Sequence, residues 1–179
     1  MVVVDEAYLE YTSDFVTRSA VSLLREGANV VVFRTFDKIY GLAGMPIGCV
    51  LAPRPLADAL RKEGAGDAEG LGRLNLVAAS VALADTAHTE HIRRAIANER
   101  ALWLSVLREL QLAHTDTHTN FVFFDTGQPQ PVLAAAMRER GIDIGRAHAP
   151  YTNWARITIG LPSENLRAQN ALRGILKES

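Results

Sequence analysis

Residues 30–48 read VVVFRTFDKIYGLAGMPIG, and this stretch decides the fold class. Its first four residues, VVVF, form a β-branched and aromatic run that predicts a buried strand. A glycine-rich turn follows over residues 41–48, and CVLA at residues 49–52 predicts another strand after it. An earlier run, VVV at residues 2–4, predicts the first buried strand, with acids at its carboxyl end. Strands and helices alternate in this way up to residue 112, which indicates an α/β fold.

Helical periodicity fills the segments between and after these strands. It predicts helices over residues 16–26, from Pro55 onward, over residues 74–112 with an interruption at residues 85–88, over residues 131–140, and from a Ser163 cap onward with Glu164 in the first turn. The apolar face predicted for the long helix consists of Ile92, Ile96, Leu102, Val106 and Leu110. Further strands are predicted at residues 120–124, 142–144 and 156–159, and the glycines between residues 64 and 72 predict a loop.

The order of these elements predicts two folding regions and a helix that connects them. We assign residues 1–88 to a larger α/β domain, residues 89–112 to the connecting helix and residues 113–179 to a small α/β domain. The chain opens directly into a strand that needs neighbours on both sides, so we expect that a front half of the larger domain is missing. A sheet without those strands has an unpaired apolar edge, and the chain is then expected to dimerise, to aggregate or to need the missing segment.

Composition and charge exclude several classes of function. The 179 residues are 48% hydrophobic and 22% charged, which is the balance of a globular protein rather than of a disordered tail. The net charge of −1 gives no electrostatic footprint for nucleic acid or an anionic membrane. Cys49 is the single cysteine, so a disulfide framework is excluded and a small buried hydrophobe is predicted. No apolar run can span a membrane and no signal peptide is recognisable, so the expected compartment is the cytoplasm.

Two polar positions beside the predicted strands could carry chemistry. Asp5, with Tyr8 nearby, follows the first strand, and an acid at the carboxyl end of a parallel strand can pair with a cationic ring nitrogen. Lys38 lies between the second strand and the glycine turn, where a partly desolvated lysine can attack a carbonyl cofactor as an amine. The alternatives are a loop acid that caps the next segment and a solvated surface lysine.

The other chemical signals are interpreted as structural. The histidine pairs, one at residues 88 and 91 and one at residues 114 and 118, predict no metal site, because a metal needs three or four converging ligands. Trp103 and Trp154 are predicted to be packing residues, because aromatic side chains chiefly supply buried area.

Four motifs together resemble the class I and II aminotransferases that use pyridoxal phosphate, most closely the histidinol-phosphate aminotransferases. They are VVDEAYLEY at residues 3–11, RTFDKIYGLAG at residues 34–44, TNFV at residues 119–122 and WARITIG at residues 154–160. They follow the family's order, and they are specific in combination although each is weak alone. The similarity spans nearly the whole chain but only about the carboxyl-terminal half of a complete member. It implies the fold-type I architecture, with a mostly parallel sheet flanked by helices and a small α+β domain after it.

The resemblance implies a role for five residues near the first two strands. Lys38 would carry pyridoxal phosphate as an internal aldimine and would then move the substrate's α-proton. Asp5 would pair with the protonated pyridine nitrogen, and Tyr8 would hydrogen-bond the phenolic oxygen of the ring. Ala7 would lie against one face of the ring, and Thr35 would help to hold the cofactor phosphate.

The later motifs imply two substrate-binding residues, and two residues near Lys38 differ from those usual in the family. Arg156 would fork onto the substrate's α-carboxylate, with Asn120 in a supporting role. Asp37 stands where the family usually has a serine before the lysine, and Pro46 stands where it usually has an arginine eight positions after it. A carboxylate repels phosphate, and proline offers neither a charge nor an N–H group. Both changes should weaken phosphate binding unless Arg34 or another cation substitutes.

The leading interpretation is pyridoxal-phosphate-dependent transamination by a homodimer. The donor would be an amino acid or an amino-alcohol phosphate such as histidinol phosphate, and the acceptor a 2-oxo acid; no nucleic-acid, membrane or metal partner is expected. A decarboxylase or lyase on the same fold is an alternative, because the cofactor supports several reactions. A truncated, non-catalytic remnant or interaction module is another. Family members bring a phosphate cup, a stacking aromatic and a ring-contacting asparagine from an amino-terminal region, and none of these precedes Asp5.

Overall fold

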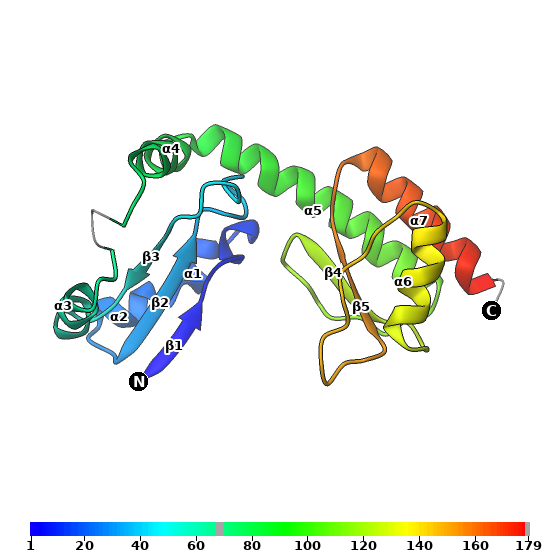
Figure 1. Cartoon of the computed structure of the whole chain (residues 1–179), viewed down its shortest axis with the longest axis horizontal. Coiled ribbons are helices and arrows are strands. Elements are labelled where there is room, and N and C mark those ends of the chain that lie inside the picture. Colours follow the sequence, from blue (N-terminus) through cyan, green and yellow to red (C-terminus); the bar gives the residue numbers. More distant parts are fainter. Residues whose placement is uncertain (67–69, 178–179) are drawn as a thin grey trace. The chain divides into compact units, whose positions relative to one another are not determined.

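The computed structural model describes residues 1–66 and 70–177. The chain divides into two compact units, unit 1 at Met1–Arg94 and unit 2 at Ala95–Ser179 (Figure 1). The glycine loop predicted between residues 64 and 72 includes residues 67–69, which lie outside the described residues.

Unit 1 is built on a three-stranded sheet with the order β1-β2-β3 (Figure 1). Its elements are β1 (Val2–Asp5), the 3-10 helix η1 (Leu9–Tyr11), α1 (Phe15–Arg18), α2 (Val21–Arg25), β2 (Val30–Thr35), β3 (Gly48–Leu51), α3 (Arg54–Lys62), α4 (Arg73–Ala84) and the start of α5 (Thr86–Glu109). β1 runs parallel to β2, with Val2 opposite Val30. β3 runs antiparallel to β2, with Thr35 opposite Gly48. The predicted α/β class is confirmed, and the sheet combines a parallel and an antiparallel pair.

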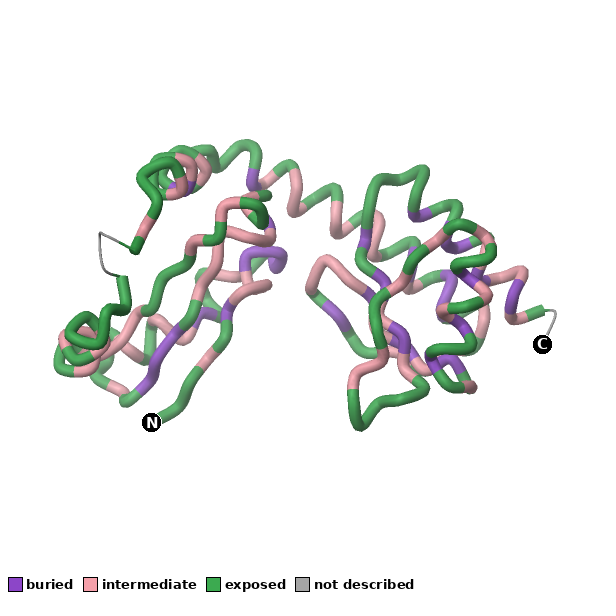
Figure 2. The backbone as a smooth tube through the Cα atoms, viewed as in Figure 1, coloured by how far each residue is buried: buried purple, intermediate pink, exposed green. Residues whose placement is uncertain are grey.

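The central strand is the buried strand of this sheet. Residues 30–32 of β2 are at most 5% exposed, and Figure 2 shows this part of the tube in purple. Val2 and Val3 of β1 are 59% and 57% exposed, and Cys49 of β3 is exposed as well. The predictions of a buried first strand and a buried cysteine are therefore wrong. In the described chain β1 and β3 each pair with one strand only, so a β-branched sequence forms a strand there without becoming buried.

The segment predicted as one helix over residues 16–26 forms two short helices instead. α1 and α2 are separated at Ser19, whose backbone is extended with φ −66° and ψ 131°. The Ser19 hydroxyl donates to the Glu6 carboxylate at 3.0 Å, and the backbone N–H of Ala20 donates to the same group at 2.7 Å. The Glu6 carboxylate, which is distant in sequence, thus binds the Ser19 hydroxyl and the Ala20 N–H at the point where the prediction had a continuous helix.

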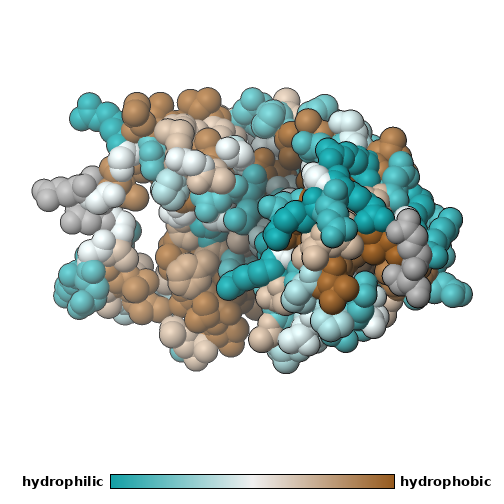
Figure 3. All heavy atoms as spheres, turned by 45° about the vertical axis from the view of Figure 1, so that its right-hand side comes forward, coloured by the Kyte–Doolittle hydropathy of each residue, from teal (hydrophilic) through white to brown (hydrophobic). Residues whose placement is uncertain are grey.

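α4 has apolar residues on all sides, and most of its surface is exposed in unit 1. Ala79 is its buried residue, whereas Leu74, Val77 and Val81 are 75%, 57% and 66% exposed. Figure 3 shows hydrophobic side chains, in brown, at the surface of the molecule. Little of the apolar area of α4 is therefore removed from water within the described part of unit 1.

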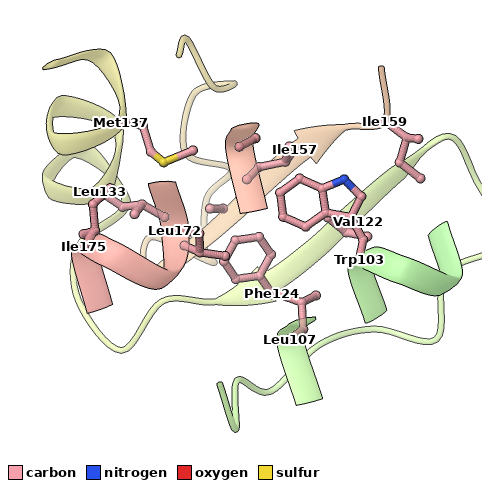
Figure 4. Close-up of a cluster of buried hydrophobic side chains, with 12 residues drawn as sticks. Trp103, Leu107, Val122, Phe124, Leu133, Met137, Ile157, Ile159, Leu172 and Ile175 are labelled. Atoms are coloured by element: carbon pink, nitrogen blue, oxygen red, sulfur yellow. The ribbon is translucent and has the colours of Figure 1, made fainter. Parts of the chain in front are cut away.

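Unit 2 packs helices against one face of a two-stranded antiparallel sheet. It contains the remainder of α5 and then β4 (Phe121–Asp125), α6 (Gln130–Glu139), β5 (Trp154–Thr158) and α7 (Pro162–Lys177). The side chains of its core are fully buried at Trp103, Leu107, Val122, Phe124, Leu133, Met137, Ala155 and Leu172. Figure 4 shows the larger side chains of this core, labelled there, converging from the helices and from both strands. Trp103 is thus a packing residue, as predicted.

Three local predictions for unit 2 are wrong. Leu102 is 55% exposed, and the core face of α5 carries Trp103 and its helical neighbours instead. Residues 142–144 form no strand, because no neighbouring strand pairs with them and Asp143 bonds to Arg138. α7 begins at Pro162, so Ser163 lies inside the helix and is not its cap.

No helix in the described ranges of the chain has the length and apolar character needed to cross a lipid bilayer.

Candidate active site

The ends of two parallel strands bring polar residues to one edge of the sheet in unit 1. Asp5 is the last residue of β1 and lies opposite Phe33, and Thr35 is the last residue of β2. The Glu6 N–H donates to the Phe33 carbonyl at 2.9 Å and continues the ladder past Asp5. Carboxyl ends of neighbouring parallel strands are where open α/β sheets bind ligands. The structure therefore brings Asp5 and Thr35 to an edge suited to a ligand.

Lys38 lies in the loop that connects β2 to β3. The loop is closed by hydrogen bonds from Phe36 N to Ile47 O at 3.1 Å and from Gly41 N to Lys38 O at 3.0 Å. The Lys38 ammonium lies 5.8 Å from the centroid of the Tyr8 ring, within the range of a cation–π contact. Among the described side chains, no carboxylate pairs with this ammonium. Tyr8 and Lys38, which are thirty positions apart in the sequence, are thus close in space, and no described carboxylate competes for the amine.

Asp5 and Ala7 form a tight turn after β1. The Ala7 N–H donates to Oδ1 of Asp5 at 2.9 Å, which is the local hydrogen bond typical of an aspartate turn. The Asp5 side chain is exposed. One carboxylate oxygen is thereby fixed by the backbone, and the group as a whole stays accessible to a cationic partner.

Thr35 and Asp37 occupy the start of the same loop. The Thr35 hydroxyl accepts the Asp37 N–H at 3.1 Å and reaches the Ile47 carbonyl at 3.5 Å. Oδ1 of Asp37 is buried and has no hydrogen-bond partner. A buried carboxylate oxygen without a donor carries an uncompensated desolvation cost. Next to Lys38 the chain therefore presents an unsatisfied acceptor.

A buried ion pair, not predicted from the sequence, holds the two strand ends together. Oε2 of Glu6 accepts hydrogen bonds from Nε and Nη2 of Arg34 at 3.0 Å and 2.8 Å. Nη2 of Arg34 also donates to the Ser19 hydroxyl at 2.9 Å. The Glu6 side chain is 3% exposed and the Arg34 side chain 27% exposed. We call Glu6, Arg34 and Ser19 the strand-end clamp. The sequence signal that could have indicated the clamp is strand alternation, because it places Glu6 and Asp5 on opposite faces.

Burial shifts the pKa of several groups near the clamp. It raises the pKa of the Glu10 carboxyl, against the opposing charges of Arg34 and Arg93. Burial also raises the pKa of Tyr11 to about 12, and the neighbouring Tyr8 and Glu10 add to this. Although Cys49 is an exposed residue, partial desolvation of its thiol raises the pKa of that group as well. A nucleophilic cysteine needs a lowered pKa, so Cys49 does not fit that role.

Unit 2 carries the other two predicted site residues on its small sheet. Arg156 lies in β5 opposite Phe123 of β4, and its guanidinium lies 5.1 Å from the centroid of the Phe121 ring. Asn120 directly precedes β4, and its carbonyl accepts the Ile159 N–H at 2.8 Å. The structure thus places Asn120 directly before β4 and Arg156 in β5, the strand that pairs with β4. Over residues 1–66 and 70–177, no cluster of three or more potential ligands is placed to hold a metal ion.

Comparison with known proteins gives one consistent result. Residues 1–172 match the family model described as aminotransferase class I and II. The chain is 36% identical to the histidinol-phosphate aminotransferase of Akkermansia muciniphila, over 98% of this chain and 47% of that protein. It is 34% identical to histidinol-phosphate aminotransferase 1 of Psychrobacter arcticus, over 99% of this chain and 47% of that protein. The chain therefore spans about half the length of these curated relatives.

Solved structures share the fold. The histidinol-phosphate aminotransferase from Sinorhizobium meliloti, solved in complex with pyridoxal-5'-phosphate, superposes with a TM-score of 0.82 at 32% identity, over 98% of this chain and 48% of that one. The histidinol-phosphate aminotransferase from Clostridium acetobutylicum superposes with a TM-score of 0.88 at 20% identity, over 99% and 54%. At that lower identity the similarity concerns the fold alone.

Proposed function

The chain belongs to the class I and II aminotransferases, and we propose that it serves in transamination dependent on pyridoxal 5'-phosphate, the cofactor of this family. The observation that carries the proposal is the surroundings of the Lys38 amine. Its amine has no carboxylate partner in the described part of the chain and lies 5.8 Å from the Tyr8 ring. An amine that no carboxylate holds is the kind of nucleophile that forms a covalent bond to an aldehyde carbon.

The residues on the ring side fit the cofactor. Asp5 is exposed and oriented by the Ala7 N–H, so its carboxylate would hold the proton on the pyridine nitrogen. Tyr8 would donate its hydroxyl hydrogen to the oxygen on the ring, and the small side chain of Ala7 would lie against the ring face. The bound cofactor supplies a sink for the electrons released at the substrate's α-carbon. Lys38 would remove the α-proton as a base and return it as an acid.

The residues on the phosphate side fit less well. Thr35 would donate its hydroxyl hydrogen to a phosphate oxygen, but Asp37 already presents an unpartnered buried oxygen nearby in the loop. Pro46 offers no N–H group. Arg34 is engaged by Glu6 and Ser19, so it is not a ready substitute cation. We therefore infer that in this chain the cofactor phosphate adds less to affinity than the covalent bond and the ring contacts do.

The substrates follow from the relatives and from Arg156. Relatives named histidinol-phosphate aminotransferases support an amino acid or an amino-alcohol phosphate such as histidinol phosphate as donor, with a 2-oxo acid as acceptor. Arg156 would bind the anionic group of the substrate through its bidentate fork, and Asn120 would support it. We propose a homodimer in the cytoplasm as the assembly; the exposed valines of β1 and α4 are apolar surface that a second copy could cover.

Borohydride reduction tests the proposal directly. The chain is mixed with pyridoxal phosphate and reduced with borohydride, which fixes the cofactor on any lysine that has bound it. The chain has three lysines, Lys38, Lys62 and Lys177, so peptide mapping then identifies each labelled lysine. We expect the label at Lys38, and we expect Lys38→Ala to remove it. Lys62→Ala is the matched control, because Lys62 is an exposed helical lysine with no role in the proposal.

The outcome also separates the alternatives. Label confined to Lys38 would support an assembled cofactor site and justify a screen of amino donors. Equal label on all three lysines, or label that persists in Lys38→Ala, would contradict the proposal. The non-catalytic remnant would then be the better description of this chain.

A further inference from the structure

One edge of β5 has no partner strand. Among the described strands, β5 pairs with β4 alone (Figure 1). The Ile159 N–H donates to the Asn120 carbonyl at 2.8 Å, so every second residue of β5, counted back from Ile159, bonds to β4. The peptide groups of Arg156 and Thr158 lie between these positions and point to the other side. No described group bonds to the N–H or to the carbonyl of either residue, so the free edge offers donors and acceptors in strand geometry.

Residues 142–145 lie beside this free edge and have unpaired backbone groups of their own. The segment touches β5 at Gly145, where an added Cβ would lie 3.6 Å from the Arg156 carbonyl oxygen. Ile142 and Ile144 are partly buried against the core of unit 2, and Asp143 between them is exposed, which is the alternation of a strand. The N–H and carbonyl groups of Asp143 and Ile144 have no hydrogen-bond partner among the described residues. The segment thus has the pattern of a strand and takes part in no ladder.

A hollow of about 330 Å³ lies between this segment and the free edge of β5. Ile142, Ile144, Ile157 and Ala168 give it an apolar wall. Unpaired main-chain groups beside an apolar wall match an extended peptide, because a strand brings both a backbone and alternate side chains. Strands β1–β4 of the described chain are already paired within their own sheets, so none of them is available for this place.

One cation at the hollow is free to meet a charged residue. Nη2 of Arg167 donates to the carbonyls of residues 140 and 141 at 2.7 Å and 3.1 Å, and no described carboxylate pairs with this guanidinium. The two acids that line the hollow are engaged, because Asp143 pairs with Arg138 at 3.0 Å and Glu164 accepts a backbone N–H at 2.8 Å. A ligand that brings a carboxylate to Arg167 is therefore favoured.

We propose that the hollow between β5 and residues 142–145, here called the edge slot, binds an extended strand of another polypeptide chain. The strand bonds through its main chain to the free edge of β5, packs apolar side chains against the apolar wall and places a carboxylate at Arg167. Neither Lys38 nor the cofactor takes part, so this interaction is independent of the proposed transamination.

A labelled peptide measures this binding to the full chain by fluorescence anisotropy. The probe is the hexapeptide TVTVTE, with fluorescein at its amino end and an amide at its carboxyl end, because it combines alternate apolar residues with one carboxylate. Two further probes carry N-methyl groups, one on both valines and the other on the second and third threonines. A strand turns the N–H groups of alternate residues to the same side, so at least one methylated probe should bind about tenfold more weakly than the parent. Equal affinity of all three probes, or no saturable binding of the parent, overturns the inference.

Two variants of one edge residue separate the main chain from the side chain. Thr158→Pro removes the outward N–H and none of the bonds to β4, and it should weaken binding of TVTVTE about tenfold. Thr158→Val is the matched control, because it keeps the N–H and should leave binding unchanged. The emission of Trp103, which is fully buried in the core of unit 2, checks that both variants fold. Equal binding by two folded variants overturns the inference.

Arg167→Gln is a second test that leaves the strand backbone intact. It should weaken binding of TVTVTE severalfold and leave binding of TVTVTQ, which lacks the carboxylate, unchanged. An equal effect on both peptides contradicts the assigned place of the carboxylate.

Sedimentation of the chain tests a second copy as the competing occupant of the edge slot. Thr158→Pro should leave the sedimentation of the chain unchanged. If Thr158→Pro and the TVTVTE peptide each dissociate an assembly of the chain, a second copy fills the edge slot and the inference is overturned.

Discussion

Removing the carboxylate of the strand-end clamp should destabilise unit 1 strongly. Glu6→Ala leaves the Arg34 guanidinium, the Ser19 hydroxyl and the Ala20 N–H without their acceptor. Breaking a buried ion pair by removing one partner costs about 3–5 kcal/mol. Arg34 is 27% exposed and can recruit water, so we expect a loss of roughly 2–4 kcal/mol in the free energy of unfolding. Glu6→Gln keeps the shape and should cost about 1–2 kcal/mol.

Urea denaturation followed by two probes measures this loss. Both tryptophans, Trp103 and Trp154, lie in unit 2, so fluorescence follows that unit, whereas far-UV circular dichroism follows both units. The unfolding transition of unit 1, which circular dichroism detects and fluorescence does not, should move to a lower urea concentration. The slope of the unfolding free energy against urea concentration should stay unchanged. Asp58→Ala is the control in the same unit. Its ion pair with Arg54 is exposed, at 45% and 85%, so the loss there should stay below about 1 kcal/mol.

A double-mutant cycle decides whether the clamp acts as a pair. Glu6→Met with Arg34→Met removes both charges, and the double variant should be more stable than the sum of the single losses by about 1–3 kcal/mol. A loss below about 0.5 kcal/mol in Glu6→Ala would refute the reasoning. Strict additivity of the two single variants would refute it as well, because independent sites add and paired sites do not.

Three further results are expected from other features of unit 1. Gly48→Ala should destabilise by about 1–3 kcal/mol in a thermal melt, because a Cβ there would meet the Arg34 carbonyl oxygen at 2.6 Å; Gly44→Ala, with nothing within 4 Å, should be neutral. Tyr11 should ionise near pH 12 in an ultraviolet titration, and Tyr11→Phe should remove that step. Because the folded pKa lies above the ordinary value of 10.0, the stability from Tyr11 is complete below pH 10 and is lost as the pH rises through 12, by roughly 2–3 kcal/mol; a wild-type alkaline curve identical to that of Tyr11→Phe would contradict this. Asp37→Ser should raise the affinity for pyridoxal phosphate severalfold, on the order of a factor of ten, and leave the affinity for pyridoxal unchanged; equal gains for both would show that Asp37 does not face the phosphate.

Local sequence signals predicted most elements of this fold because each depends on a few neighbouring residues. The β-branched run at residues 30–32 is both a strand and buried. Proline at residue 55 lies in the first turn of α3, as its fixed φ angle suggests. The break in the long helical segment occurs at Asp85, whose carboxylate accepts the His88 N–H at 2.9 Å. In each case, the deciding contact lies within about one turn of chain.

Apart from the Ser163 cap, which the start of α7 at Pro162 places inside the helix, the wrong predictions depend on contacts from elsewhere in the chain. Val3 and Cys49 have the residue types of buried positions, but burial requires a neighbour on each side of a strand, which a single run of sequence does not specify. The helix over residues 16–26 is divided at Ser19 by the distant Glu6 carboxylate. Residues 142–144 have a strand pattern and no partner strand. Periodicity predicts on which face of a helix or strand a residue lies. Tertiary contacts decide whether another part of the protein buries that face.

Alternation along the strands also explains why the candidate site and its support lie next to each other in sequence. Asp5 and Glu6 are adjacent, yet Asp5 is exposed and Glu6 is bonded to Arg34 in the interior. Thr35 and Arg34 also lie on opposite faces of β2, although both are only partly exposed. The candidate site residues are therefore predicted from the family motifs alone, whereas the clamp depends on the register between the two strands. If the clamp orients the strand ends, Glu6→Gln should slow reductive labelling of Lys38 while the transition of unit 2 stays in place. Unchanged labelling would restrict the clamp to stability alone.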